Sequence, residues 1–141
     1  MAKYLQTKQD ITLALAQQLV AAGVTAATQK NVQVSVAILD LSGNLKAFAQ
    51  MDNAAPVSVQ VAIGKAASAI QLQDESGVFE QFVNNGQPSM MSTPGVLPLQ
   101  GGVPIKVSQA VVGAVGVSGS TGDGDLALAR KIVAVAEKQL S

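Results

Sequence analysis

The sequence contains neither cysteine nor histidine among its 141 residues. Without a thiol, the chain has no disulfide and no thiolate nucleophile. Without an imidazole, it lacks the commonest general base, the commonest protein ligand for metals and the usual haem ligand. These absences predict no metal site. They favour a protein that binds something over one that performs acid–base or nucleophilic chemistry with its own side chains.

Aromatic and charged residues are also scarce, at 3% and 13% of the chain. The hydrophobic share is 48%, so the core has to be built mainly from Ala, Val, Leu and Ile, which allow close backbone packing. Nine basic residues balance nine acidic ones, and zero net charge argues against nucleic-acid binding, which needs a basic surface. A surface so poor in charge is best explained if other subunits cover part of it, and we therefore expect a homo-oligomer.

The length fits a single domain spanning residues 1–141. No apolar run is long enough to cross a membrane, and the opening MAKYLQTKQD is polar from residue 3 onward, unlike a secretory signal. We therefore expect a cytoplasmic protein without a membrane partner.

The pattern of apolar residues predicts an α/β (α+β) chain in which hairpins are separated by helices. Such an order is typical of an antiparallel sheet that carries helices, rather than of a doubly wound parallel sheet. A long loop at 87–102, with three of the five prolines, is expected to serve binding or assembly. The predicted helices are 8–22 (capped by Thr7 and stopped by Gly23), 56–72, 74–84 and 126–140 (capped by Asp125, with Val135 among its core residues), and the predicted strands are 32–38, 45–51, 103–107 and 109–117.

The strand at 109–117 reads QAVVGAVGV, which is apolar throughout and predicts a central strand covered on both faces. Gly113 and Gly116 would let either a helix or a ligand approach its backbone. The loop that follows, 118–125, is rich in glycine and leads into the last helix. Its backbone N–H groups can either contact an anion or be capped by Asp123 and Asp125, and the capping interpretation is favoured.

A few side chains stand out as candidates for chemistry. Lys65 lies on an apolar helix, where it is either a partly buried group that acts as a nucleophile or contacts an anion, or a lysine that extends its stem across an apolar surface. Asp40 and Asp52 flank the first hairpin, and their turn contexts favour turn stabilisation over a glycosidase-like pair. Met90 and Met91 are either soft ligands for haem iron or packing residues.

Several segments taken together resemble the GlcG/HbpS family, which also includes the C-terminal domain of PduO-type corrinoid adenosyltransferases. The resemblance implies a profilin-like three-layer α/β/α fold with a five-stranded antiparallel sheet, and assemblies from dimers to octamers. It also implies haem binding in some members and a place in glycolate or diol utilisation in others. The segments that carry it are D-x-x-G at 40–43, Met51-Asp52, Lys65-Ala66, Leu97-Pro98, GGVPI at 101–105, GAVGVSG at 113–119, and Asp123 with Asp125.

The sequence departs from the family pattern at Gln50, where the family commonly has an arginine that can pair with a carboxylate or a haem propionate. Since histidine is absent, any haem would have Met, Tyr, Lys or a hydroxyl as its axial partner, or no axial partner from the protein. The predicted ligand site lies between the long loop and the sheet, with Lys65 contacting an acidic group of the ligand. Its residues are Asp52, Lys65, Gly102, Val103, Pro104, Ile105, Gly116, Ser118 and Gly119.

Three functions follow from these observations. The first is a small-ligand-binding or accessory protein, with haem, another tetrapyrrole or a corrinoid as the possible ligand, in haem handling or in glycolate or diol metabolism. The second is an enzyme of unknown reaction that uses Lys65 or an aspartate. The third is a structural oligomer subunit that binds no ligand.

Overall fold

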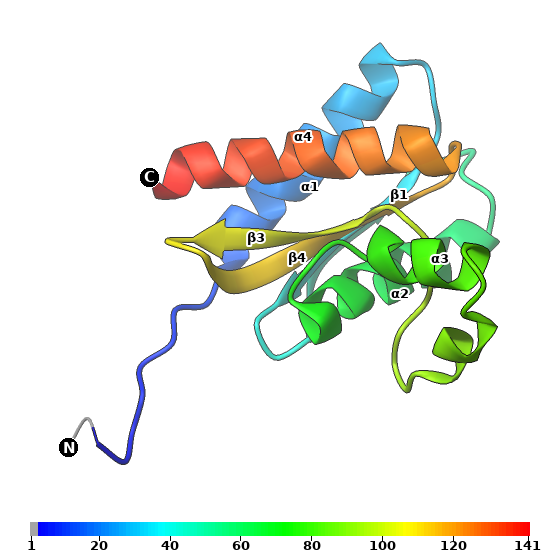
Figure 1. The fold of residues 1–141 in the computed structure, drawn as a ribbon. Coiled ribbons are helices and arrows are strands. Elements are labelled where there is room, and N and C mark those ends of the chain that lie inside the picture. The colour runs from blue at the N-terminus through cyan, green and yellow to red at the C-terminus, as the bar shows by residue number, and fades with distance from the viewer. Residues whose placement is uncertain (1–2) are drawn as a thin grey trace.

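The computed structural model describes residues 3–141, which form one four-stranded antiparallel sheet built from two hairpins (Figure 1). The strand order is β2-β1-β4-β3, so the two hairpins meet through β1 and β4, where Ile38 lies opposite Val115. Both hairpins were predicted, and both are confirmed. The strands are β1 (Ser35–Asp40), β2 (Leu45–Gln50), β3 (Gly102–Val107) and β4 (Ala110–Ser118).

The fifth strand implied by the resemblance is not found within residues 3–141. The segment before the first helix runs beside the sheet but meets it through a single backbone hydrogen bond, from the Ile11 N–H to the Val112 carbonyl at 3.3 Å. Val112 lies at the irregularity in the pairing of β3 with β4, so its carbonyl is free to accept this bond. One such bond is too few to make a strand, and β2 and β3 remain the edges.

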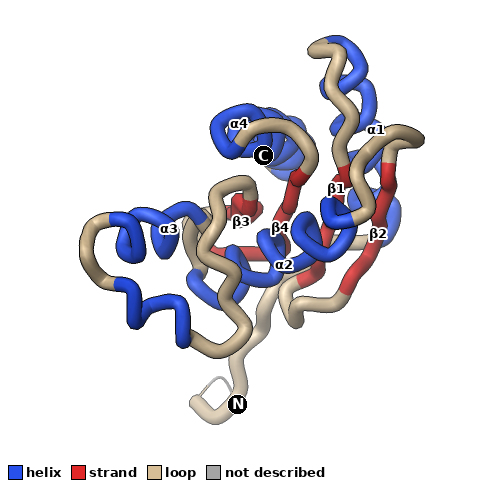
Figure 2. Tube along the Cα trace, turned by 90° about the vertical axis from the view of Figure 1, so that its right-hand side faces the viewer, coloured by secondary structure: helices blue, strands red, loops and turns tan. Residues whose placement is uncertain are grey.

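Helices cover both faces of the sheet, which confirms the three-layer arrangement (Figures 1 and 2). The first and last helices share one face, and the second helix covers the other. A short third helix and a 3₁₀ turn lie beyond the second helix, and none of their residues is buried. The helical elements are α1 (Leu13–Gln29), α2 (Val57–Leu72), α3 (Gly77–Asn84), η1 (Pro88–Ser92) and α4 (Gly122–Leu140).

The first helix differs from its prediction at both ends. It begins at Leu13, because Thr12 rather than Thr7 is its cap and accepts a hydrogen bond from the Leu15 N–H at 3.2 Å. Gly23 was expected to end the helix but lies within it, where a Cβ would come within 2.7 Å of the Ile132 side chain on α4. The glycine therefore allows α1 and α4 to pack closely.

The two central strands are buried on both faces. Every residue of β1 is buried, with Val36 and Ile38 packed toward α1 and α4, and Ala37 and Leu39 packed toward α2. In β4, a Cβ on Gly116 would overlap the carbonyl oxygen of Ala62 in α2. Either a helix or a ligand was expected to approach the backbone at Gly116, and the structure shows that the helix α2 does so.

The last helix begins at Gly122, and Thr121 is its cap, accepting a hydrogen bond from the Gly124 N–H at 3.0 Å. The predicted cap, Asp125, lies inside the first turn instead. Val135 was expected in the core but is 37% exposed. Asp40 does stabilise the first hairpin turn, as favoured, because its carboxylate accepts from the backbone N–H groups of Ser42 and Asn44.

Candidate functional site

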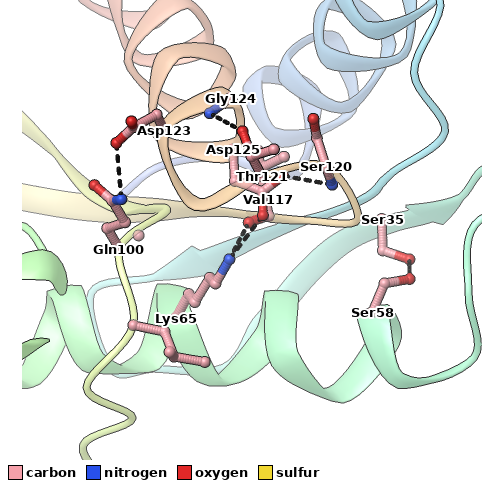
Figure 3. Close-up of polar contacts among 12 residues, drawn as sticks. Ser35, Ser58, Lys65, Gln100, Val117, Ser120, Thr121, Asp123, Gly124 and Asp125 are labelled. Atoms are coloured by element: carbon pink, nitrogen blue, oxygen red, sulfur yellow. Dashed lines mark hydrogen bonds and ion pairs between the residues drawn. The ribbon is translucent and has the colours of Figure 1, made fainter.

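A buried ion pair joins the two helical layers at the end of β4 (Figure 3). The Lys65 Nζ on α2 donates to the Asp125 Oδ2 on α4 and to the Val117 carbonyl oxygen of β4, each at 3.0 Å. Both residues are 3% exposed. Lys65 is thus a buried lysine, as one of its two interpretations required, and its acidic partner belongs to its own chain.

The glycine-rich loop that precedes α4 makes hydrogen bonds within the protein (Figure 3). The Asp125 Oδ1 accepts from the Ser120 N–H at 2.9 Å, so that the two oxygens of this carboxylate are shared between the loop and Lys65. The Gln100 side chain donates to the Asp123 carboxylate at 3.0 Å and links the long loop to the same turn. Two carboxylates at a helix N-terminus interact favourably with its dipole. The loop N–H of Ser120 is thus bound by a carboxylate of the chain itself, although the helix cap is Thr121 rather than either aspartate.

The end of the long loop closes over the lysine. Gly101 has a φ of 126°, and a Cβ there would come within 2.8 Å of the Lys65 Nζ. The Ser76 hydroxyl accepts from the Gly102 N–H at 2.9 Å and donates to the Leu99 carbonyl at 2.5 Å. These contacts shut the Lys65–Asp125 pair away from solvent.

The pair has the character of a structural connection between layers. Within residues 3–141, no buried side-chain nitrogen or oxygen lacks a hydrogen-bond partner. Neither Lys65 nor Asp125 lines any of the four cavities identified along this part of the chain. The Lys65 amine is buried and bound to Asp125 and to the Val117 carbonyl, and a nucleophilic role for it stays a prediction.

The predicted ligand residues do not converge on one pocket. Those that surround the ion pair or fill the core are Gly102, Ile105, Gly116 and Ser118, all buried, while Gly119 is exposed at the start of the loop. Val103 and Pro104 border a cavity at the edge of β3, and Asp52 borders a separate groove between α1 and β2. A ligand-contacting role for these residues stays a prediction.

The β3-edge cavity has a volume of about 310 Å³ and lies between the free edge of the sheet, α4 and the turn before α3. Apolar atoms of Val103, Val133 and Ala134 form part of its wall. Two cationic side chains, Lys106 and Arg130, also border it, together with the three carboxylates of Asp74, Glu75 and Glu137. Sequence analysis missed both cations, because each is an ordinary exposed residue whose position matters only after β3 and α4 come together.

Arg130 is held by a carboxylate at the same cavity. Its Nε and Nη2 donate to the two oxygens of Glu75, both at 2.8 Å. The hydrogen bond and the charge of Glu75 raise the pKa of the guanidinium above its ordinary value, against a small opposing effect of burial. Arg130 therefore remains a cation at every working pH, with a planar donor group suited to carboxylates.

The groove beside Asp52 is larger, at about 440 Å³, and two of its side chains, Gln50 and Met51, form hydrogen bonds within the chain. Gln50, which stands where the family commonly has arginine, donates to the Ala54 carbonyl at 3.2 Å. The Met51 sulfur accepts from the Val34 N–H at 3.4 Å. Asp52 itself is exposed.

Two general findings concern metals and membranes. Within residues 3–141, no group of three or more His, Cys, Asp or Glu side chains is placed to hold a metal ion. Met91, one of the two candidate soft ligands on η1, is 60% exposed, and neither it nor Met90 borders any of the four cavities. No helix in the same range is both long and apolar enough to cross a bilayer.

Comparison with known proteins gives concordant results. Residues 11–134 match the family model described as "Haem degrading protein HbpS-like". The chain is 37% identical to protein GlcG of Escherichia coli K12 over 114 residues, which is 81% of this chain and 85% of the relative. Two crystal structures are similar over most of their length. A double variant of Streptomyces reticuli HbpS superposes with a TM-score of 0.85 at 32% identity, covering 94% of this chain and 90% of that one. A complex of PduOC with haem superposes with a TM-score of 0.81 at 26% identity, covering 89% and 94%.

Proposed function

Because this chain belongs to the GlcG/HbpS family, we propose that it is a binding protein for haem or a related tetrapyrrole, held through the ring and its carboxylates rather than through the metal. The observation that carries the proposal is the likeness over nearly the whole chain to a protein solved with haem bound. The absence of cysteine and histidine from the sequence supports the proposal that the metal is not the point of attachment, since these residues are the usual strong ligands of haem iron.

We place the ligand at the β3-edge cavity, because it combines an apolar wall with two cations. Its volume of about 310 Å³ is near the lower end of the range of roughly 300–1,000 Å³ for ligand pockets, and it is open to solvent, so it would contact only part of a macrocycle. Val103, Val133 and Ala134 offer an apolar wall to the ring. Lys106 offers positive charge to a propionate, and Arg130 can bind one through two hydrogen bonds if the propionate replaces Glu75, its partner in the free protein. The carboxylates of Asp74 and Glu137 on the same lining oppose this attraction.

The residues of this cavity fit the ring of haem better than its iron. Its lining holds no histidine, cysteine, methionine or tyrosine, and Lys106, its one lysine, contacts a propionate in this proposal. Bound haem would supply the redox chemistry of its iron, while the chain's own residues would bind the ring, orient it and neutralise its carboxylates. Recognition without an axial ligand predicts that the metal contributes little to affinity.

The proposal is tested by titrating the protein with haem and with iron-free protoporphyrin IX, followed by absorbance and fluorescence. We expect the two dissociation constants to agree within a few-fold, and Arg130→Ala to weaken both by about tenfold, the usual effect of losing one charge-assisted hydrogen bond. Lys131→Ala is the matched control, because Lys131 is an exposed cation next to Arg130 that does not border the cavity. A free-haem spectrum that does not change on adding protein would overturn the proposal.

Haem degradation is the second candidate function, because the description of the matching family names it. Oxidative opening of the ring consumes dioxygen and electrons, so an external reductant is required. Incubating the haem-loaded protein with ascorbate in air tests this activity. Loss of the Soret band faster than for free haem supports degradation. A stable spectrum excludes degradation under these conditions and does not affect the proposal that the protein binds haem. A role in glycolate or diol metabolism stays a prediction that gene neighbourhood would test.

A further inference from the structure

Two exposed surfaces on this chain are complementary, and we propose that they bind each other between copies: the N-terminal arm of one copy packs against the α3–η1 surface of another. The N-terminal arm is the segment 3–9, and the α3–η1 surface is the segment 77–92. This interaction goes beyond tetrapyrrole binding, because neither surface borders the β3-edge cavity.

The N-terminal arm is exposed at every residue, and it extends away from the sheet toward the N-terminus (Figures 1 and 2), while its segment 6–9 borders a groove with Leu41 and residues 110–112. Tyr4 is 82% exposed and Leu5 is 68% exposed. These are large side chains whose transfer from water would be favourable, and the Lys3 ammonium lies 5.3 Å from the centre of the Tyr4 ring. A tyrosine is among the residues most often found at the centre of interfaces.

The α3–η1 surface carries valine, phenylalanine and methionine side chains among polar ones, and it contributes no buried residue to the core. Phe79 and Phe82 contact each other on α3 with their rings tilted and their ring centres 5.6 Å apart, and Phe82 is 37% exposed. Met91 on η1 is 60% exposed. The chain has one tyrosine and three phenylalanines, none of them buried. Three of these aromatics thus lie on the two surfaces of the proposed contact.

Charge complementarity favours the same pairing. The N-terminal arm carries Lys3 and Lys8 and no acidic residue. The α3–η1 surface carries Glu80, with Asp74 just before α3, and no lysine or arginine occurs between Lys65 and Lys106. Opposite charges around an apolar centre steer association and disfavour contact of either surface with its own copy.

The arm and the surface of one chain do not face each other. The arm leaves the body at the end opposite to α3 in Figure 1, after Ile11 is fixed to β4 by its backbone hydrogen bond. The acceptor is therefore a second copy of this chain. Such a contact joins two different surfaces, and a closed ring or a pair of exchanged arms satisfies every copy.

Engineered cysteines test the contact directly, since the natural chain has none to interfere. A tagged Tyr4→Cys protein is mixed with an untagged Phe82→Cys protein under mild oxidation, and non-reducing electrophoresis separates the products. We expect a disulfide-linked dimer of one tagged and one untagged chain. Val57→Cys replaces Phe82→Cys in the control, because Val57 is 68% exposed at the start of α2 and lies outside the proposed contact.

A yield no higher than in the control overturns the proposal, and so does a Tyr4→Cys/Phe82→Cys double variant that links only within single chains. Light scattering after size exclusion gives a second measurement that does not depend on cysteine. Tyr4→Ala is expected to weaken self-association by about tenfold or more, as truncation of an interface anchor does. A wild-type protein that is monomeric at micromolar concentration also overturns the proposal. Porphyrin titration of the same variants reports separately on the proposed function, because these residues do not border the β3-edge cavity.

Discussion

Breaking the Lys65–Asp125 pair should destabilise the domain more than any change to a surface charge. Asp125→Asn is the informative substitution, because asparagine retains an oxygen that can accept from the Ser120 N–H while it removes the charge opposite the Lys65 Nζ. The ammonium then stays 3% exposed without a counter-charge. Removing one partner of a buried pair costs about 3–5 kcal/mol of unfolding free energy.

That cost is a large part of the total stability of a domain, which is about 5–15 kcal/mol. For a chain of this length, each kcal/mol lowers the melting temperature by about 3 °C, so we expect a loss of about 10–15 °C. Lys65→Met should cost a similar amount, because it leaves the carboxylate unpaired. The Lys65→Met/Asp125→Asn double variant restores neutrality and should be more stable than the sum of the single effects predicts.

Thermal and urea unfolding of the four proteins, followed by circular dichroism, gives the complete cycle. The reasoning is refuted if both single variants lose less than about 1 kcal/mol, which is the range of exposed ion pairs. Strictly additive effects in the double variant would refute it as well, since the two side chains would then act independently.

Three further predictions concern the free energy of unfolding. Gly116→Ala should lower it by about 3 kcal/mol or more, because the new methyl group would overlap the Ala62 carbonyl. Gly95→Ala should lower it by only about 1 kcal/mol through backbone strain, since the φ of Gly95 is 72° and its surroundings are open. Urea unfolding of the two variants compares these losses. Thr121→Ala should cost about 1 kcal/mol through loss of the α4 cap, and an unchanged urea midpoint would exclude that role. Arg130→Ala should cost only about 0.5 kcal/mol, because its side chain is 59% exposed, so weaker porphyrin binding by this variant could not be ascribed to unfolding.

Local chemistry in the sequence was sufficient to predict the hairpins and the second helix. The Asp40 turn depends on hydrogen bonds among neighbouring residues, and the small residues of α2 indicate close packing wherever the helix lies. The family resemblance was also visible from the order of the motifs, and it is confirmed.

Features that depend on contacts between distant segments could not be predicted. Gly23 is a residue type that often ends a helix, and only the position of Ile132 on α4 shows that Gly23 instead allows two helices to pack closely. Asp125 is a residue type that often caps a helix, but its hydrogen-bond partner Lys65 lies 60 residues away in the sequence, so the pair could not be predicted from local pattern. The β3-edge cavity combines Lys106 with Arg130 from another element, and no pattern in either segment marks them as neighbours.

The central claim is that this chain holds a tetrapyrrole by its ring and carboxylates, and a crystal structure of the complex with haem tests it most directly. The account predicts electron density along the free edge of β3, with the propionates at Lys106 and Arg130 and no protein atom bound to the iron. Density at another surface, or iron bound by a methionine of η1, would contradict it.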